Sequence, residues 1–200
     1  SFLKNFLNIL FWVFILLAVF YFSGQNPLTD HPVFSGLTAL FSALAITLPY
    51  IIYQKTQLKE KYTIKLPLIL ESLISLSLIL GWLGTLKFYK IGIGYDSFVH
   101  FSTSFLGVLM AFIILSVIFV KNRKTTLLII IFLVVIFGGI FNEFFQKYGD
   151  RRWGTEMFGE IGQPNDTSRD LIYDTLGTFM GVFLVGFNGE KWVQNLEKNA

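Results

Sequence analysis

The fold is decided by residues 165–181, which read N-D-T-S-R-D-L-I-Y-D-T-L-G-T-F-M-G. Asp170 and Asp174 are four residues apart, and on a helix this spacing places both carboxylates on one face. Gly177 and Gly181 continue that face as a G-x-x-x-G step, which is typical of close packing between membrane helices. The stretch therefore predicts a membrane helix with acids near its start and a glycine packing surface further along the same face.

The composition indicates an integral membrane protein. Of the 200 residues, 54% are hydrophobic and only 14% are charged, so an ordinary soluble domain is excluded. The net charge of +3 comes from Lys and Arg in short loops, so we interpret it as topology information and expect no nucleic-acid partner. The chain has no cysteine, which excludes disulfides, thiolate metal ligands and a cysteine nucleophile.

Six apolar runs predict an all-α bundle of about six transmembrane helices in a single polytopic domain, residues 1–200. The first run could be a signal peptide, but it is long and no A-x-A site follows, so we interpret it as a membrane span. We find no internal repeat and no linker long enough for a second domain. The predicted spans are residues 6–22, 33–53, 66–86, 98–120, 125–148 and 169–187.

The basic residues predict that both termini are cytoplasmic. Six spans put the two ends of the chain on the same side, and the positive-inside rule selects that side. The basic residues that would then face inward are Lys4, Lys55, Lys59, Lys61, Lys65, Lys121, Arg123, Lys124, Lys191 and Lys198. We accordingly expect a multi-pass protein of a bacterial or archaeal inner or plasma membrane, embedded in the lipid bilayer.

This orientation brings polar residues of three spans to the outer face. They are Asp96 and His100 at the start of the fourth span, Glu143 and Gln146 at the end of the fifth, and Asp170 and Asp174 at the start of the sixth. Within each pair the spacing of three or four residues places both side chains on one helical face. Three helices are therefore expected to present polar stripes at a similar depth.

One imidazole among several carboxylates is a suitable ligand set for a divalent ion such as Zn, Mn, Fe, Mg or Ca. The predicted ligands are Asp96, His100, Glu143, Asp170 and Asp174. The same residues could also act without a metal, with Asp96 orienting His100 as a general base and a second carboxylate as acid or nucleophile. The predicted catalytic residues are His100, Asp96 and Glu143.

Three arginines lie in or beside the predicted outer loop. The guanidinium groups of Arg151, Arg152 and Arg169 could hold a phosphate or a carboxylate, and Gln146 is a further predicted substrate-binding residue. The alternative is that these arginines belong to a solvated or headgroup-facing loop. His31 is also predicted outside, but next to a proline we interpret it as an interfacial or capping residue.

Structural interpretations stay open beside the functional ones. The whole cluster could be an interhelical network of hydrogen bonds and ion pairs that fixes the bundle. Thr167 or Asp166 could cap the last helix with Asp170 as a partner, although this leaves Asp174 without a role. In the third span, Glu71 could snorkel to the cytoplasmic surface, pair with a polar group, or belong to a proton path that would favour transport.

Motifs in the second half of the chain resemble two groups of small bacterial membrane proteins. The segments Y-D-S-F-V-H-F at 95–101 and D-T-S-R-D-L at 166–171, with Glu143 and Gly177, resemble the uncharacterised YjdF-like inner-membrane family. The order D-x-x-x-H, Glu, D-x-x-x-D before a glycine is similar to VanZ-like proteins, one of which is associated with glycopeptide antibiotic resistance. The resemblance implies a polytopic protein acting at the cell envelope.

The sequence therefore predicts an outward-facing His and carboxylate site that hydrolyses or transfers a group on a lipid-linked or cell-envelope substrate, assisted by a divalent metal ion. Two other classes remain as alternatives. One is a transporter or ion-coupled carrier. The other is an accessory structural subunit that packs through Gly177 and Gly181. No oligomeric state follows from the sequence.

Overall fold

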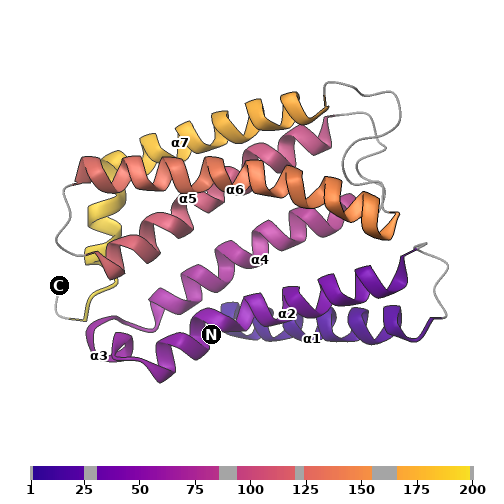
Figure 1. Ribbon diagram of the computed structural model, residues 1–200. Coiled ribbons are helices and arrows are strands. Elements are labelled where there is room, and N and C mark those ends of the chain that lie inside the picture. Colours follow the sequence, from indigo (N-terminus) through magenta and orange to yellow (C-terminus); the bar gives the residue numbers. More distant parts are fainter. Residues whose placement is uncertain (1, 25–30, 86–93, 120–123, 155–165, 199–200) are drawn as a thin grey trace. The chain divides into compact units, whose positions relative to one another are not determined.

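The protein is helical throughout the part of the chain that its computed structural model describes, residues 2–24, 31–85, 94–119, 124–154 and 166–198. The helices are α1 (Phe2–Phe22), α2 (Pro32–Lys55), α3 (Leu58–Lys61), α4 (Lys65–Thr85), α5 (Tyr95–Ile118), α6 (Lys124–Trp153) and α7 (Asp166–Gln194) (Figure 1). Within these ranges the β-structure is limited to an isolated bridge between Tyr62 and Glu197. The predicted all-α fold is confirmed.

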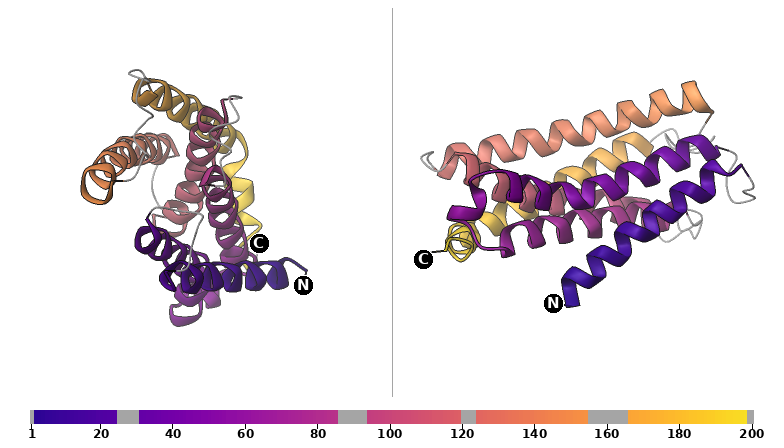
Figure 2. Two further views of the ribbon diagram at one scale, coloured as in Figure 1. Left: turned by 90° about the vertical axis from the view of Figure 1, so that its right-hand side faces the viewer. Right: turned by 90° about the horizontal axis from the view of Figure 1, so that it is seen from below.

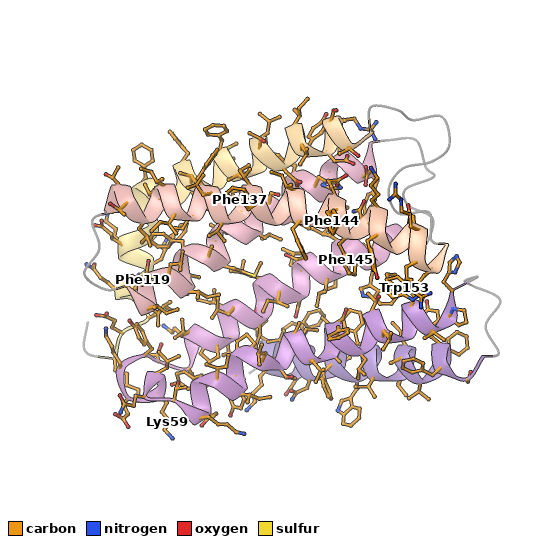
Figure 3. All side chains as sticks on the ribbon, in the orientation of Figure 1. Lys59, Phe119, Phe137, Phe144, Phe145 and Trp153 are labelled. Atoms are coloured by element: carbon orange, nitrogen blue, oxygen red, sulfur yellow. The ribbon has the colours of Figure 1, made fainter. Side chains whose placement is uncertain are left out.

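Six of these helices, all except α3, are long and apolar enough to cross a membrane. They contain 20 to 30 residues each, and about 20 apolar residues suffice to span the hydrocarbon core. Large apolar side chains such as Phe137, Phe144 and Phe145 of α6 are exposed, as Figure 3 shows, which suits a surface in contact with lipid. The chain is a multi-pass membrane protein, as predicted, and the side on which its termini lie stays a prediction.

Several helices extend beyond the predicted spans. The sixth span was expected to end at residue 187, but α7 continues to Gln194 because Trp192 and Val193 pack against the apolar core. The α6 helix likewise continues beyond residue 148, to Trp153. The short helix α3 lies in the lysine-rich segment that we expected to be a loop.

Contacts divide the chain into two compact units, which we describe one at a time. Unit 1 comprises Ser1–Leu78, Trp153–Thr155 and Leu196–Asn199, and unit 2 comprises Ile79–Arg152, Glu156–Asn195 and Ala200. Unit 1 thus holds α1, α2, α3 and most of α4, whereas unit 2 holds the end of α4 with α5, α6 and α7. The prediction of a single domain stays a prediction.

In unit 1, α1 and α2 lie side by side (Figures 1 and 2). Gly36 permits this contact, since a Cβ atom there would lie 2.8 Å from the Phe22 ring. On α4, Glu71 is buried, with 7% of its surface exposed, and hydrogen-bonds the backbone of Tyr50. Lys4 lies close to it, with its ammonium 5.5 Å from the centre of the Tyr50 ring. Glu71 is therefore buried, with polar neighbours on α1 and α2, and a part in a proton path stays a prediction.

In unit 2, α5 and α7 lie side by side (Figures 1 and 2). A Cβ atom on Gly177 would collide with the backbone carbonyl of Phe101, and one on Gly181 would lie 2.7 Å from the Cβ of Val108. The G-x-x-x-G step is therefore the surface on which α7 meets α5, as predicted. Below it, the apolar core of α5, α6 and α7 consists of Val108, Phe112, Leu127, Ile131 and Val185.

Replacing Gly177 by alanine should destabilise the protein by about 1–3 kcal/mol, because the new methyl group meets backbone that cannot rotate away. The matched control is Gly186→Ala on the same helix, where a Cβ would make an ordinary contact of 3.7 Å with Leu128. That change should be neutral or stabilise by up to about 1 kcal/mol. Thermal unfolding of the detergent-solubilised protein, followed by circular dichroism, measures both, and equal effects would contradict the proposed packing.

Candidate functional site

Five polar side chains gather where α5 and α7 begin and α6 approaches its end, all within unit 2. They are Asp96 and His100 of α5, Glu143 of α6, and Asp170 and Asp174 of α7, and we call them the His–carboxylate cluster. Gly94 precedes α5 with a φ of 63°, a left-handed conformation that glycine adopts without strain. The chain therefore enters α5 abruptly, and the first two turns of α5 carry Asp96 and His100.

The His100 ring is the centre of the cluster, because both of its nitrogens face carboxylates. Its Nδ1 atom lies 3.2 Å from Asp174 Oδ1. Its Nε2 atom lies 3.8 Å from Asp96 Oδ1 and 3.8 Å from Asp170 Oδ2. The shorter separation is a hydrogen bond, whereas the two longer ones exceed hydrogen-bond distance. The ring is therefore tethered on one side and faces two carboxylate oxygens on the other.

Asp174 is held in place by contacts with α5 and α6. The Ser104 hydroxyl donates to Asp174 Oδ1 at 2.7 Å, so this oxygen contacts both Ser104 and His100. The other oxygen, Oδ2, lies against Gly139 of α6, where a Cβ atom would approach it to 2.6 Å. Ser104 was not among the predicted site residues, although its position one turn after His100 on the same face was the signal for it.

Four of the five side chains of the cluster are almost completely buried, and Asp96 is partly exposed, with 27% of its side chain accessible. The exposed fractions are 7% for His100, 5% for Glu143, 3% for Asp170 and 4% for Asp174. Within the described residues, Glu143 Oε1 and Asp174 Oδ2 have no hydrogen-bond partner. Buried polar atoms are rarely left in this state, because the lost hydration costs roughly 1–3 kcal/mol for each group. Both oxygens are thus buried acceptors for which the described residues offer no donor.

Three groups of the cluster have the spacing of metal ligands. One atom each from Asp96, His100 and Asp170 lie within 4.8 Å of one another. Ligand atoms about 2.1 Å from a common ion are separated from each other by roughly 3–4 Å. The two 3.8 Å separations from His100 Nε2 agree with that range. These three side chains could hold an ion with small adjustments of their rotamers.

Glu143 and Thr167 connect α6 with the start of α7. The Thr167 side chain hydrogen-bonds the Glu143 carboxylate, and Glu143 interacts electrostatically with His100, Asp174 and Asp96. Thr167 was predicted as a possible helix cap, but it lies inside α7, which begins at Asp166. The side chain of Asp166, predicted as the other possible cap, lies outside the described part of the structure.

The structure brings one of the three predicted arginines to the cluster. Arg169 Nη2 lies 3.7 Å from Asp96 Oδ2, and 47% of the Arg169 side chain is exposed. Arg151 and Arg152 are exposed in the last turn of α6, and Gln146 is half-buried one turn after Glu143. Their substrate-binding roles stay predictions.

Two further predictions concern His31 and the outer loop. His31 stands at the N-cap position of α2 in unit 1 but makes no side-chain capping hydrogen bond, so its interpretation as an interfacial or capping residue stays a prediction. Residues 155–165 of the predicted outer loop lie outside the described part of the chain.

Six apolar helices of membrane-spanning length, with a buried His–carboxylate cluster between three of them, define a polytopic helical membrane protein with an internal polar site. The chain belongs to the family described as "Predicted membrane protein (DUF2238)", whose family model matches residues 8–190. The YjdF-like resemblance is consistent with this membership, whereas the VanZ-like resemblance stays a prediction. No curated protein and no solved structure matched the chain.

Replacing Gly139 by alanine should disturb His100, because the new methyl group would displace the Asp174 carboxylate that binds Nδ1. The neighbouring Gly138 provides the matched control, since nothing lies within 4 Å of a Cβ atom there. In a His31→Gln background, the ¹⁵N shifts of His100 report the change directly. We expect a shift for Gly139→Ala and none for Gly138→Ala, and unchanged spectra for both would contradict the placement of Asp174.

Proposed function

We propose that the His–carboxylate cluster binds a divalent metal ion, and that the protein uses this ion to hydrolyse or transfer a group on a lipid-linked or cell-envelope substrate. The observation that carries the proposal is the arrangement of the His100 ring. Nε2 faces Asp96 and Asp170 at 3.8 Å each, while Nδ1 is hydrogen-bonded to Asp174. Metal-bound histidines commonly bond a carboxylate through the second ring nitrogen in this way.

This arrangement divides the five predicted ligands into two groups. Asp96, His100 and Asp170 would bind the ion, whereas Glu143, which lies outside this group but interacts electrostatically with His100 and Asp96, would act as a base. Asp174 would orient His100, because it occupies the opposite ring nitrogen. An imidazole ligand favours Zn, Mn or Fe over Ca, which prefers oxygen ligands alone.

The charges of the cluster support a bound cation. Its four carboxyl groups are accompanied by one imidazole and by the guanidinium of Arg169. Buried carboxylates inside a membrane protein are costly unless positive charge accompanies them. A divalent ion would offset the excess of negative charge.

For the hydrolysis of a phosphate ester, each residue would have a separate role. A bound divalent ion makes a water molecule a better nucleophile at neutral pH. Arg169 would hold the phosphate oxygens, for which its guanidinium has a suitable geometry. As the water oxygen bonds to phosphorus, the bond from phosphorus to the lipid oxygen breaks. Glu143 would accept a proton from the water and return it to the departing lipid oxygen.

The distribution of basic residues supports an outward-facing cluster in the cytoplasmic membrane of a bacterium or archaeon. The clustered lysines of the α2–α4 region include Lys55, Lys59 and Lys61, which are exposed. By the positive-inside rule they would lie in the cytoplasm. With that orientation the starts of α5 and α7 would lie at the outer face, where lipid-linked envelope substrates would be accessible.

Transport is the second candidate function, and the burial of Glu71 is the observation that favours it. A carboxylate buried in a membrane helix is a functional candidate in its own right. Glu71 lies near Lys4 and the Tyr50 backbone in unit 1, separate in sequence from the cluster. A carrier would need this group, whereas the enzyme that we propose would retain its metal and its turnover after Glu71→Gln.

Elemental analysis of protein purified without a chelator should find a stoichiometric divalent metal. His100→Ala and Asp170→Ala should each lose it, because each removes a ligand. Asp174→Asn should keep it with an affinity lower by about 10–100-fold, as expected for a residue that orients a ligand. His31→Ala removes the chain's other histidine and serves as the control, which should bind normally. Absence of metal from well-folded wild-type protein would overturn the proposal.

The variant Glu143→Gln should distinguish a loss of turnover from a loss of metal binding. With the metal-loaded protein and a long-chain phosphatidic acid in mixed micelles, we expect release of inorganic phosphate. Glu143→Gln should lower kcat by about 10²–10⁴-fold, the usual contribution of a general base, while metal remains bound. Arg169→Gln should mainly raise KM. Full activity of Glu143→Gln would contradict its assigned role, and inactivity of the loaded wild type would contradict phosphate-ester hydrolysis.

A further inference from the structure

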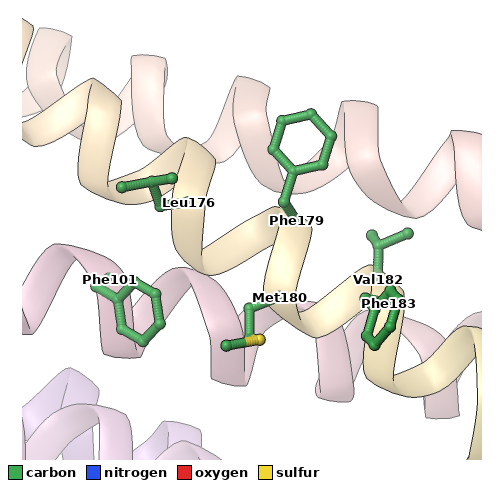
Figure 4. Close-up of a pocket in the computed structure, with 6 residues that line it drawn as sticks. All are labelled: Phe101, Leu176, Phe179, Met180, Val182 and Phe183. Carbon is green, nitrogen blue, oxygen red and sulfur yellow. The ribbon is translucent and has the colours of Figure 1, made fainter.

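An apolar groove on unit 2 begins beside the His–carboxylate cluster. Its volume is about 550 Å³, within the range of roughly 300–1,000 Å³ that is common for ligand sites. Figure 4 shows that α5 contributes one of its lining residues and α7 the others. The lining residues are Phe101, Leu176, Phe179, Met180, Val182 and Phe183. We call this surface the α7 groove.

The α7 groove is linked to the cluster through Arg169, which contacts Asp96. Phe101 directly follows His100 in sequence, whereas Leu176, two residues after Asp174, projects about 160° round the helix from it. From Leu176 to Phe183 the helix advances by about 10 Å, at 1.5 Å per residue. Measured from Arg169, the groove begins about 10 Å along the helix and ends about 21 Å along it. It thus crosses the middle of a hydrocarbon core that is about 30 Å thick.

The exposed face of α7 is complementary to an anionic phospholipid. Arg169 lies two helical turns before Leu176, so the guanidinium and the start of the groove share one side of the helix. The Arg169 side chain is half-exposed and contacts Asp96 of the cluster. Beyond it, the same side is apolar as far as Phe183. A cation at one end and hydrocarbon along the rest match an anionic head followed by an acyl chain.

The walls of the α7 groove are held in place by contacts within the protein. The α5 and α7 backbones touch where Gly177 meets the Phe101 carbonyl, which closes the floor between the two helices. The Phe179 ring is supported by Phe132 of α6, with ring centres 5.0 Å apart. In Figure 4, Phe179 projects from the side of α7 that faces α6. Such preformed walls reduce the ordering cost of binding a chain.

We propose that the α7 groove binds one hydrocarbon chain of a long-chain lipid phosphate whose head group lies at Arg169 and the His–carboxylate cluster. This inference rests on the proposed function, for which it names the substrate class. Bound in this way, the chain positions the phosphate at the cluster. The protein therefore discriminates between long-chain and short-chain lipid phosphates that carry the same head group.

Photo-crosslinking tests the groove without any mutation. The probe is a phosphatidic acid with a diazirine in its acyl chain, added to the full-length protein in phosphatidylcholine nanodiscs. We expect labelled peptides to concentrate at Phe101 and at residues 176–183. Excess unlabelled phosphatidic acid should compete, whereas diacylglycerol, which lacks the phosphate, should not. Equal labelling of the exposed α6 face around Phe137 and Phe144, without competition, would show bulk lipid contact and overturn the proposal.

A matched pair of variants tests the consequence for turnover. Met180→Trp fills the groove, and Ile114→Trp makes the same change at an exposed position of α5 outside it. With metal content unchanged, Met180→Trp should lower kcat/KM for dipalmitoyl phosphatidic acid at least tenfold and leave dihexanoyl phosphatidic acid unaffected. Ile114→Trp should change neither.

The two proposals fail in different ways. If Met180→Trp has no effect while the wild type binds metal and releases phosphate, the groove proposal is overturned and the proposed function stands. If the wild type holds no metal and releases no phosphate from either lipid, the proposed function is overturned. Competed labelling of residues 176–183 would then still support the groove as a lipid phosphate site.

Discussion

The site depends on the close approach of α5 and α7 at Gly177. At this position α7 lies against the Phe101 carbonyl, with no room for a side chain, so the two helices are fixed at one separation and one register. That register brings Asp174 level with His100 and Ser104, which lie on either side of Phe101 in sequence. A membrane interior provides no hydrophobic force between helices, so small residues and polar contacts must provide this specificity.

The buried carboxylates impose the second constraint, because each of them must be compensated inside the bundle. Asp174 is compensated by His100 and Ser104, and Asp96 by Arg169. Glu143 receives a hydrogen bond from Thr167 on one side, and its Oε1 atom has no partner among the described residues. A purely structural network would be expected to satisfy its members fully, since a partly satisfied buried network destabilises a fold. The open acceptors of Glu143 and Asp174 are therefore what the proposed bound cation would account for.

The helices could be predicted from local spacing, and the members of the cluster from that spacing together with the predicted topology, which brings the polar ends of three spans to one side. The sequence could not predict which ring nitrogen of His100 faces which acid, since this depends on the rotation of α5 against α7. Ser104 was missed because a hydroxyl in a helix usually bonds its own backbone, as Thr103 does to the Val99 carbonyl at 2.8 Å. The role of Gly139 was also hidden, because its neighbour Asp174 comes from another helix.

The register of α7 also explains how a lipid could reach a buried site. At about 100° per residue, Asp170 and Asp174 point toward α5 and α6, while Arg169 and Leu176 lie about 100–160° round the helix from them. The inward stripe carries the polar cluster, and a separate stripe, more than a quarter-turn away, carries a cation followed by apolar side chains. In the proposed binding mode, a head group held by Arg169 would lie beside Asp96, which contacts both Arg169 and His100. The same helix would thus hold the acyl chain on its lipid-facing side and direct the phosphate toward the polar interior.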